Sequence, residues 1–361
     1  MVQLFLTGGR LGRFTPRILI LLLLLPALAL AKPKTTAPEV WELSLDGGRK
    51  LVWERSFSSE TEVRKVGFWG KVVDVVAGAP VMHSMVRPYS VVTDSRGRII
   101  VTDPGAAGVH IFDFTEHKYK FIQRIKDEHD SMFSPQCVAV GAQDNIYVTD
   151  SNAGLIFVFD ANGKFQHTLG SLRGGEGYYE RPTGIAVDSA AGRIYVSDTL
   201  RHKVLILDMQ GKVIQLIGQK GQNDGEFYFP TELRLIGPDL IVVDAMNFRL
   251  QFLDRAGNFE SSIGTIGDGE GAIFRPKAVA VDSEGDVYVV DSSLGIVQVF
   301  NRKGQLLYYF GEKGTHAGEF QMPSGLYIDH GDQVYVVDSF NRRVQIFHYF
   351  GLTKPAGEAT Q

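Results

Sequence analysis

The sequence has a single cysteine, Cys137, among its 361 residues. One cysteine cannot form an internal disulfide, so the fold must be stable without such cross-links. No cysteine stands directly after the apolar segment near the N-terminus, which argues against lipid attachment by the usual bacterial lipoprotein route. A basic excess is also missing: the formal net charge is −4, which argues against a general nucleic-acid-binding protein.

Common motifs of metal-dependent and nucleophilic enzymes are absent as well. The nine histidines include no His-x-x-x-His pair and no His/Cys cluster, and there is neither a Gly-x-Ser-x-Gly elbow nor a phosphate-binding Gly-Lys-Ser/Thr loop. These absences favour a protein without metal, cofactor or catalytic residues, and they leave enzymatic activity as an open question. The composition, 44% hydrophobic and 22% charged, is that of a globular protein.

The first 31 residues have the pattern of a signal peptide. A basic segment (10–17) precedes an aliphatic run that begins at Ile18, and Ala29–Ala31 supplies the small residues of a cleavage site. The alternative is an uncleaved anchor, but the apolar run has about 13 residues, short of the roughly 20 that span a bilayer. We expect cleavage, a linker over 32–48, no transmembrane segment in the mature chain, and a periplasmic or secreted protein.

Two markers recur along the chain with one period. Six times a proline opens a strand-like apolar segment, and six times a second such segment ends in aspartate. The prolines, 46 to 48 residues apart, are Pro88, Pro135, Pro182, Pro230, Pro276 and Pro323, and the aspartates are Asp103, Asp150, Asp198, Asp244, Asp291 and Asp338. Because both markers keep the same period, the chain is built from tandem repeats.

Each repeat contains four short segments typical of β-strands. In the repeat that begins at Pro276 they are 279–282, 287–291, 297–300 and 305–310, rich in β-branched and aromatic residues and separated by Gly-containing turns. A four-stranded sheet of this kind cannot bury both faces by itself, and radial stacking of six sheets solves the problem. The sequence therefore predicts an all-β protein: a six-bladed β-propeller of four-stranded antiparallel blades over residues 85–350.

These repeats resemble the NHL family, and the chain resembles its exported bacterial six-bladed members. The resemblance is carried by Pro-x-Gly-Ile-Ala-Val-Asp … Ile-Tyr-Val-Ser-Asp at 182–198, by Asp-Ser-Phe-Asn-Arg-Arg-Val-Gln-Ile-Phe at 338–347, and by Gly-rich segments before the prolines. It implies the fold and no particular function. Repeats one, two and five lack the Asn/Arg pair, and repeat four has 236–238 (Ile-Gly-Pro) in place of the first-turn aspartate.

The two ends of the repeat array complement each other. The sixth repeat lacks a fourth strand, and residues 49–57 alternate as a strand does, so we expect them to pair with 344–347 and close the ring. Residues 60–77 have apolar residues at helical spacing, which predicts an amphipathic helix that packs across the propeller or contacts a membrane or partner. Residues 351–361 are expected to form a flexible tail.

The loops before the prolines and those after the aspartates should share one face, where binding surfaces are commonly built. Three prolines are preceded by arginine, Arg87, Arg181 and Arg275 in repeats one, three and five, and Lys277 adds a further charge. On a six-fold ring the arginines would lie about 120° apart around the axis, which suits an anionic ligand. The alternative is that arginine is merely tolerated at an exposed position.

Repeat four departs from the pattern of the innermost strand. Two and four residues after the proline it has Glu232 and Arg234, where the other repeats have small or apolar residues or Tyr327. Both lie on one face of the strand, either as a structural ion pair or as charged groups that line the axial channel. The six aspartates recur too regularly for catalysis, and we expect them to accept hydrogen bonds from the turns that follow.

Aromatic residues of the proline-side loops are candidate anchors for a ligand, with packing of the loops over the blades as the alternative. They are Tyr89, Tyr178, Tyr179, Phe227 and Phe229. We expect an exported, non-enzymatic binding or scaffold protein, a monomeric domain that holds a protein, peptide or glycan on this face and binds no nucleic acid. The alternative is a metal-dependent propeller hydrolase or lyase, of lactonase or amidating-lyase type, that uses Glu232 with nearby basic groups.

Overall fold

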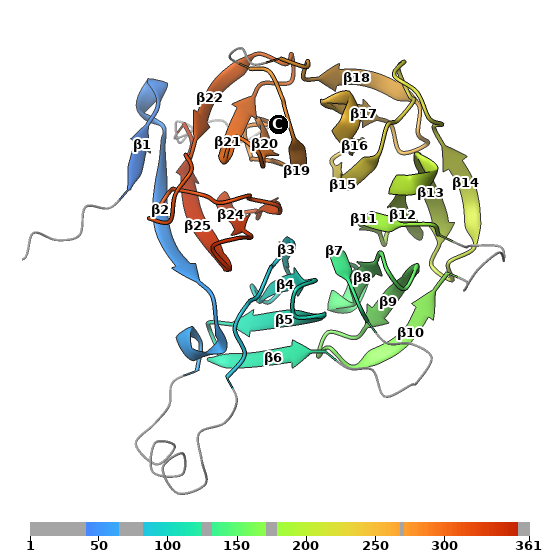
Figure 1. The fold of residues 1–361 in the computed structure, drawn as a ribbon, viewed down its shortest axis with the longest axis horizontal. Coiled ribbons are helices and arrows are strands. Elements are labelled where there is room, and N and C mark those ends of the chain that lie inside the picture. The colour runs from blue at the N-terminus through green and yellow to red at the C-terminus, as the bar shows by residue number, and fades with distance from the viewer. Residues whose placement is uncertain (1–40, 65–81, 124–131, 171–178, 268–270, 353–361) are drawn as a thin grey trace, which may run out of the picture. The chain divides into compact units, whose positions relative to one another are not determined.

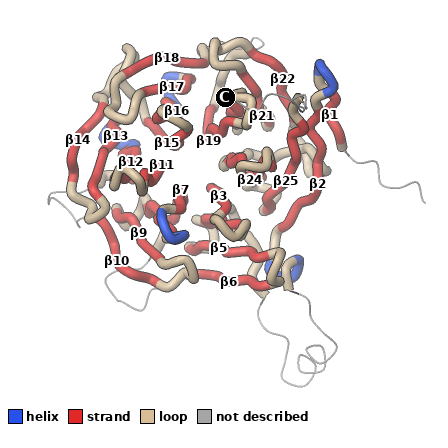
Figure 2. The backbone as a smooth tube through the Cα atoms, turned by 180° about the vertical axis from the view of Figure 1, so that it is seen from behind, coloured by secondary structure: helices blue, strands red, loops and turns tan. Residues whose placement is uncertain are grey.

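The computed structural model describes residues 41–64, 82–123, 132–170, 179–267 and 271–352. Within them the strands form six antiparallel sheets in a ring, which confirms the predicted six-bladed propeller (Figure 1). The first strand of each blade lies near the axis and the last strand lies on the perimeter, as the view from behind also shows (Figure 2). No helix in these residues has the length and apolar character needed to cross a bilayer.

Blades 1 to 3 have four strands each, in chain order from the axis outward. Blade 1 consists of β3 (Ser90–Thr93), β4 (Ile99–Asp103), β5 (Gly108–Asp113) and β6 (Lys118–Ile122). Blade 2 consists of β7 (Pro135–Val140), β8 (Ile146–Asp150), β9 (Leu155–Phe159) and β10 (Phe165–Leu169). Blade 3 consists of β11 (Pro182–Asp188), β12 (Arg193–Asp198), β13 (Lys203–Asp208) and β14 (Val213–Ile217).

Blades 4 and 5 repeat this plan, and blade 6 begins in the same way. Blade 4 consists of β15 (Pro230–Ile236), β16 (Asp239–Asp244), β17 (Arg249–Leu253) and β18 (Phe259–Ile263). Blade 5 consists of β19 (Pro276–Val281), β20 (Val287–Asp291), β21 (Ile296–Phe300) and β22 (Leu306–Phe310). The C-terminal strands of blade 6 are β23 (Leu326–Ile328), β24 (Gln333–Asp338) and β25 (Arg343–Phe350).

Blade 6 is completed by the N-terminal end of the propeller. β2 (Lys50–Phe57) pairs antiparallel with β25, with Trp53 opposite Phe347 and Phe57 opposite Val344. This is the closing strand that the sequence predicts at 49–57. β1 (Glu42–Ser44) adds a fifth strand outside β2.

The remaining segments before blade 1 differ in part from the prediction. The linker expected over 32–48 contains β1 and a 3-10 turn, η1 (Asp46–Gly48), within its described part. Of the helix expected over 60–77, the described residues include η2 (Glu60–Glu62), a single 3-10 turn. The rest of that helix, the signal peptide and the tail from 353 lie outside the described residues. Three more 3-10 turns follow later strands: η3 (Ala142–Asp144), η4 (Thr199–Arg201) and η5 (Ala245–Asn247).

A hydrophobic cluster fills each of the six contacts between neighbouring blades. The second strand of a blade is apolar on both faces because a blade lies on either side of it, and β16 is buried along its whole length. The closing strand contributes Leu51 to the contact of blades 5 and 6, and Phe57 to that of blades 6 and 1. The centroid of the Phe57 ring lies 4.8 Å from that of Phe112 in blade 1. The two ends of the ring are thus joined by main chain and side chains alike.

Side-chain hydroxyls link several neighbouring blades near the axis. In blades 1 to 3 the residue before the strand-end aspartate is Thr102, Thr149 or Ser197, and its hydroxyl donates to a main-chain carbonyl of the next blade. Ser197 Oγ, for example, lies 2.7 Å from the carbonyl oxygen of Thr231. The equivalent residue in blades 4 to 6 is valine. Blades 6 and 1 are linked from another position, where Ser324 Oγ donates to the carbonyl of Tyr89 over 2.9 Å.

Replacing Phe57 with alanine should lower the free energy of unfolding by about 3 to 5 kcal/mol, because the change empties a buried site between the first and last blades. Phe340→Ala is the matched control: the Phe340 side chain is 58% exposed, and we expect a change within about 0.5 kcal/mol. Urea unfolding followed by circular dichroism measures both. Equal stability of the two variants would contradict a closing role for β2.

Candidate functional site

The loops before the prolines and the turns after the strand-end aspartates meet on one face of the ring, which we call the proline face. Buried aspartates hold the two together. Asp198 accepts hydrogen bonds from the main-chain N–H groups of Glu180 (2.9 Å) and Arg181 (2.8 Å), both in the loop before β11. In the same way Asp103 accepts a hydrogen bond from the main-chain N–H of Arg87, and Asp291 accepts one from that of Arg275. These bonds fix the main chain of the other two predicted arginines.

These aspartates have more partners than the sequence predicts. They accept hydrogen bonds from the following turn, as expected, for example from the N–H of Ala106 to Asp103. The preceding loop is a second partner that a local reading of the sequence misses. In blade 6 the aspartate also accepts bonds from side chains of the Asn/Arg motif and the glutamine after it: Asn341, Arg343 and Gln345. This motif therefore stabilises the loops.

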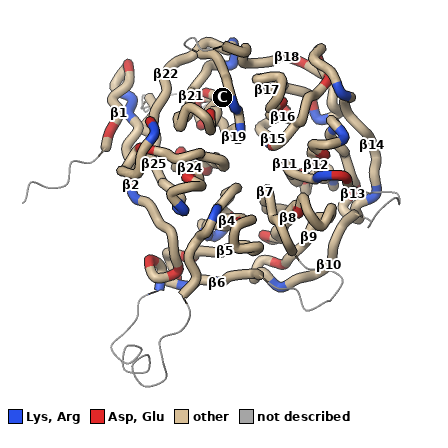
Figure 3. The backbone as a smooth tube through the Cα atoms, in the orientation of Figure 1, with Lys and Arg blue, Asp and Glu red and all other residues tan. Residues whose placement is uncertain are grey.

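Three basic side chains gather where the proline face meets the axis. Arg181 and Arg275 precede β11 and β19, and Lys277 is the second residue of β19, on which Figure 3 shows a basic segment near the centre of the ring. Burial lowers the pKa of Lys277, and the charges of Arg275 and Arg181 lower it further. Burial raises the pKa of Tyr89, against the opposing effect of both arginines. We call these four residues the axial cluster; in the described part of the chain, none of its cations has a carboxylate partner.

Arg87 does not join the axial cluster through any contact in the described residues. It is exposed on blade 1, and the pKa of Lys277 responds to Arg181 and Arg275 without a contribution from Arg87. The turn after β4 packs closely on Arg87, since a Cβ added at Gly105 would lie 2.8 Å from Arg87 Cβ. The structure thus brings together two of the three predicted arginines.

Glu232 and Arg234 form an ion pair inside the ring. Glu232 Oε1 lies 2.6 Å from Arg234 Nη2, and the two side chains are 5% and 11% exposed. Arg234 Nη2 also donates to the carbonyl of Leu326, 2.9 Å away, so the guanidinium reaches from blade 4 to blade 6. Burial raises the pKa of Glu232 to about 7, although Arg234 opposes the shift. The structural ion pair is therefore present, and Arg234, without Glu232, also lines a cavity on the axis.

This axial cavity has a volume of about 180 Å³ and is lined by side chains from all six inner strands: β3, β7, β11, β15, β19 and β23. Its lining residues come three to six positions after the prolines, so it lies toward the end of the inner strands that is remote from the proline face. Apart from Thr93, Arg234 and Tyr327, the lining side chains are apolar.

Phe229 packs in an aromatic cluster with His202 and Tyr228 on the proline face. Its ring centroid lies 4.5 Å from that of His202 and 4.9 Å from that of Tyr228. Its φ of 57° is unusual for a bulky residue, and its N–H donates to His202 Nδ1 over 3.0 Å, which helps to hold this conformation. Two other aromatic residues of these loops, Tyr179 and Phe227, are fully buried. For them the packing alternative holds, and they cannot be ligand anchors. Tyr178 lies outside the described residues.

Sequence reasoning missed a set of exposed apolar side chains on the proline face, which we call the apolar ring. Every blade contributes at least one, and their exposed fractions range from 39% to 58%: Val86, Phe133, Leu200, Met246, Phe274, Leu294 and Phe340. Three of them stand two residues before a proline, and four stand in the turns after the strand-end aspartates. A comparison of these positions between repeats would have found them, because large apolar residues are unexpected in exposed loops.

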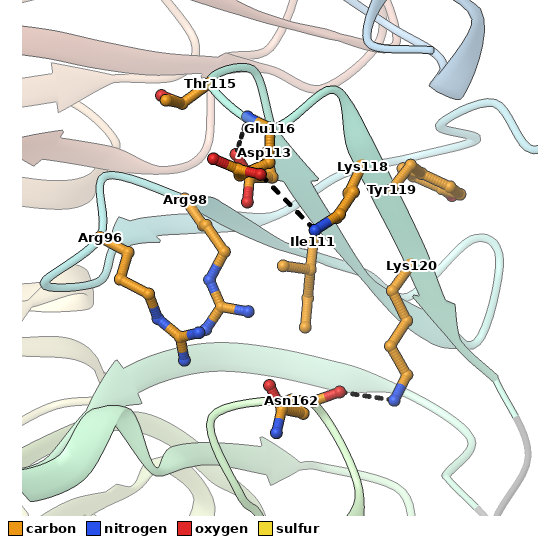
Figure 4. Close-up of a pocket in the computed structure, with 10 residues that line it drawn as sticks. All are labelled: Arg96, Arg98, Ile111, Asp113, Thr115, Glu116, Lys118, Tyr119, Lys120 and Asn162. Carbon is orange, nitrogen blue, oxygen red and sulfur yellow. Dashed lines mark hydrogen bonds and ion pairs between the residues drawn. The ribbon is translucent and has the colours of Figure 1, made fainter.

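A larger cavity of about 730 Å³ lies between the outer parts of blades 1 and 2 (Figure 4). Its basic residues have partners within the protein. Lys120 Nζ donates to the carbonyl of Asn162 over 2.6 Å, and Lys118 Nζ lies 3.6 Å from Glu116 Oε2. The two arginines of this cavity, Arg96 and Arg98, pair with aspartates. The basic groups of this larger cavity already have partners within the protein. We therefore regard the axial cluster as the stronger candidate site.

Replacing Glu232 with glutamine should remove a pH dependence from stability. The pKa of Glu232 is raised in the folded protein, so the folded state binds this proton more tightly than the unfolded chain. The resulting stabilisation is complete below the ordinary pKa of 4.5 and is lost as the pH rises through about 7. Between these two values the wild type should lose about 3 kcal/mol relative to Glu232→Gln.

Urea unfolding at several pH values measures this difference. Glu312→Gln, which changes an exposed carboxylate, is the control and should leave the profile of the wild type unchanged. Parallel pH profiles of the wild type and Glu232→Gln would show that folding does not raise the pKa of this carboxyl group.

Comparison with known proteins supports the fold. Residues 134–159 match the model of the NHL repeat family. A search of curated proteins returned no match. A gluconolactonase from Xanthomonas campestris is a similar solved structure, with a TM-score of 0.57 and 15% identity, and the match covers 84% of this chain and 91% of that one.

Two further solved structures are similar at the level of the fold. One is an auxiliary nutrient binding protein from Bacteroides thetaiotaomicron, with a TM-score of 0.57, 12% identity, and coverage of 73% of this chain and 69% of that one. The other is a streptogramin B lyase, with a TM-score of 0.54, 14% identity, and coverage of 73% and 93%. Since binding proteins and enzymes share this architecture, the likeness extends to the fold alone. The matched repeat and the ring of six four-stranded blades show that the chain is a six-bladed β-propeller with an NHL repeat in blade 2.

Proposed function

We propose that the protein is a binding module that holds a polypeptide partner on its proline face, with an acidic group of the partner at the axial cluster. The observation that carries the proposal is the set of uncompensated cations formed by Arg181, Arg275 and Lys277. Burial lowers the pKa of Lys277, and the like charges of Arg275 and Arg181 at close range lower it further. An anionic ligand would relieve this repulsion, and arginine offers it paired hydrogen bonds.

The apolar ring favours a polypeptide over a glycan as the partner. Its seven side chains surround the ring on the same face as the axial cluster, and three of them are phenylalanines: Phe133, Phe274 and Phe340. A protein surface or peptide can bury apolar side chains against such groups, whereas most of a glycan surface is polar. Acidic groups flanked by apolar side chains are therefore the chemistry that we expect of the partner.

The proposal places this binding outside the cytoplasm. It rests on the signal-peptide pattern of residues 1–31, and the single cysteine is compatible with an oxidising compartment because it is buried and unpaired. In this setting the protein would act as a receptor or scaffold in the periplasm or after secretion.

A metal-dependent hydrolase or lyase is the alternative, and the described residues do not fit its metal. No group of three or more His, Cys, Asp or Glu side chains among them is arranged to hold an ion. Glu232, the acid on which that alternative depends, is paired with Arg234 and buried. We derive no catalytic step for this site.

Selection from a random peptide library on the immobilised protein tests the proposal, with a glycan array in parallel. Enriched peptides should carry Asp or Glu next to large apolar residues. For the best of them, labelled with fluorescein, Arg181→Glu/Arg275→Glu should weaken binding at least tenfold, and Phe133→Ser/Phe274→Ser should weaken it severalfold.

Arg96→Glu, in the cavity of Figure 4, is the matched control for a change of charge and should bind the peptide as the wild type does. Melting temperatures of all variants check the fold. Enrichment of neutral peptides, binding that resists the double charge reversal, or binding to glycans or anionic vesicles in place of peptides would overturn the proposal.

A further inference from the structure

Arg234 of the Glu232–Arg234 pair also faces the axial cavity, which the proposed function does not use. Arg234 lines this cavity together with Thr93 and Tyr327, whose hydroxyl oxygens lie 3.4 Å apart. Arg234 Nη2 is engaged by Glu232 and a carbonyl, whereas Arg234 Nε is buried and has no hydrogen-bond partner among the described residues. A buried N–H group without an acceptor is destabilising, because it has lost its hydrogen bonds to water. An acceptor that enters the cavity would restore such a bond.

The wall of the cavity determines what can carry that acceptor. Apart from the three polar side chains it is apolar, and valines such as Val140, Val187 and Val281 contribute to it from three blades. Beyond those three groups the wall offers no hydrogen bonds, too few for the many polar groups of a sugar or a hydrated phosphate. Its volume of about 180 Å³ suits a small ligand, since an apolar cavity of about 150 Å³ in another protein holds benzene. A carboxylate is the anion whose planar shape matches the guanidinium group.

We propose that the axial cavity is a second binding site, which takes a small monocarboxylate with a compact apolar body. The carboxylate binds Arg234, and the hydrocarbon part lies against the valines. The site is independent of the proposed function, because its residues belong to the far end of the inner strands and include no member of the axial cluster.

Binding at this site competes with the Glu232 carboxylate for Arg234. The titratable and charged groups that face Glu232 are Arg234 on its own strand, Tyr89 before β3 and Cys137 on β7. Burial raises the pKa values of Tyr89 and Cys137, so both are neutral near pH 7, and Arg234 is the charged neighbour that matters. When Glu232 takes up a proton, its electrostatic attraction to the Arg234 guanidinium weakens. A ligand anion can then take the place of the Glu232 carboxylate. The ligand should therefore bind more tightly below the pKa of Glu232, which is about 7.

Titration calorimetry of the purified protein with sodium benzoate tests the site. We expect saturable binding of one benzoate, roughly tenfold tighter at about pH 6 than at about pH 8. Benzoate is ionised at both values, whereas Glu232 is mostly protonated at the lower pH and mostly ionised at the higher one. Benzyl alcohol, which has the same ring and no charge, should bind at least tenfold more weakly. In Glu232→Gln the dependence on pH should disappear.

Two variants locate the binding. Arg234→Met should weaken benzoate at least tenfold, and Val281→Phe, which keeps the arginine and fills the cavity, should abolish binding. Arg96→Met, a matched removal of an exposed arginine outside this cavity, should leave the affinity unchanged. Absence of binding by the wild type at about pH 6, equal affinity for benzyl alcohol, or benzoate binding that survives Val281→Phe in a folded protein would overturn the proposal, whatever the outcome for the proline face.

Discussion

The proline face depends on one interaction, repeated six times: a buried carboxylate that accepts hydrogen bonds from the main chain of a loop. All six strand-end aspartates are fully buried. A carboxylate is stable in such a place only when hydrogen bonds replace its water, and the loop before each proline supplies them. Each loop is therefore held by the second strand of its own blade, and the side chain that precedes the proline begins from a fixed main-chain position.

This scaffold allows neighbouring blades to carry very different side chains near the axis. Arg234 is buried, and its charge is compensated by Glu232 on the same strand. Arg181 and Arg275 lie on the proline face without such a partner among the described residues. Burial lowers the pKa of Lys277, and these two arginines lower it further. The same residue type is thus paired with a carboxylate in one blade and has no such partner among the described residues in two others. The difference lies in the neighbouring side chains, since the main-chain plan is shared.

Much of the fold can be predicted from sequence because its signals are local and repeated. Prolines and aspartates mark the strands of every blade. Because the sixth repeat lacks a fourth strand, the strand-like residues 49–57 are the expected replacement. β1 has three residues, too few for a periodic signal. The sequence leaves open whether Tyr179 and Phe227 face a ligand or pack inward, because a loop aromatic can turn either way. The contact between blades that buries them is not local. The convergence of Lys277 with two arginines likewise depends on the packing of blades 3 and 5 around the axis.

The closing strand has a consequence for the order in which the protein folds. Lys50 pairs with Phe350, at the opposite end of the propeller sequence. At a synthesis rate of 5 to 20 residues per second, the ribosome needs roughly 15 to 60 s to produce the partner of a strand that it made near the start. During that time β2 presents unpaired N–H and carbonyl groups together with its apolar residues, the combination that promotes association with other chains. A factor that binds the N-terminal strand while the blades are made would act at the most vulnerable point of the molecule.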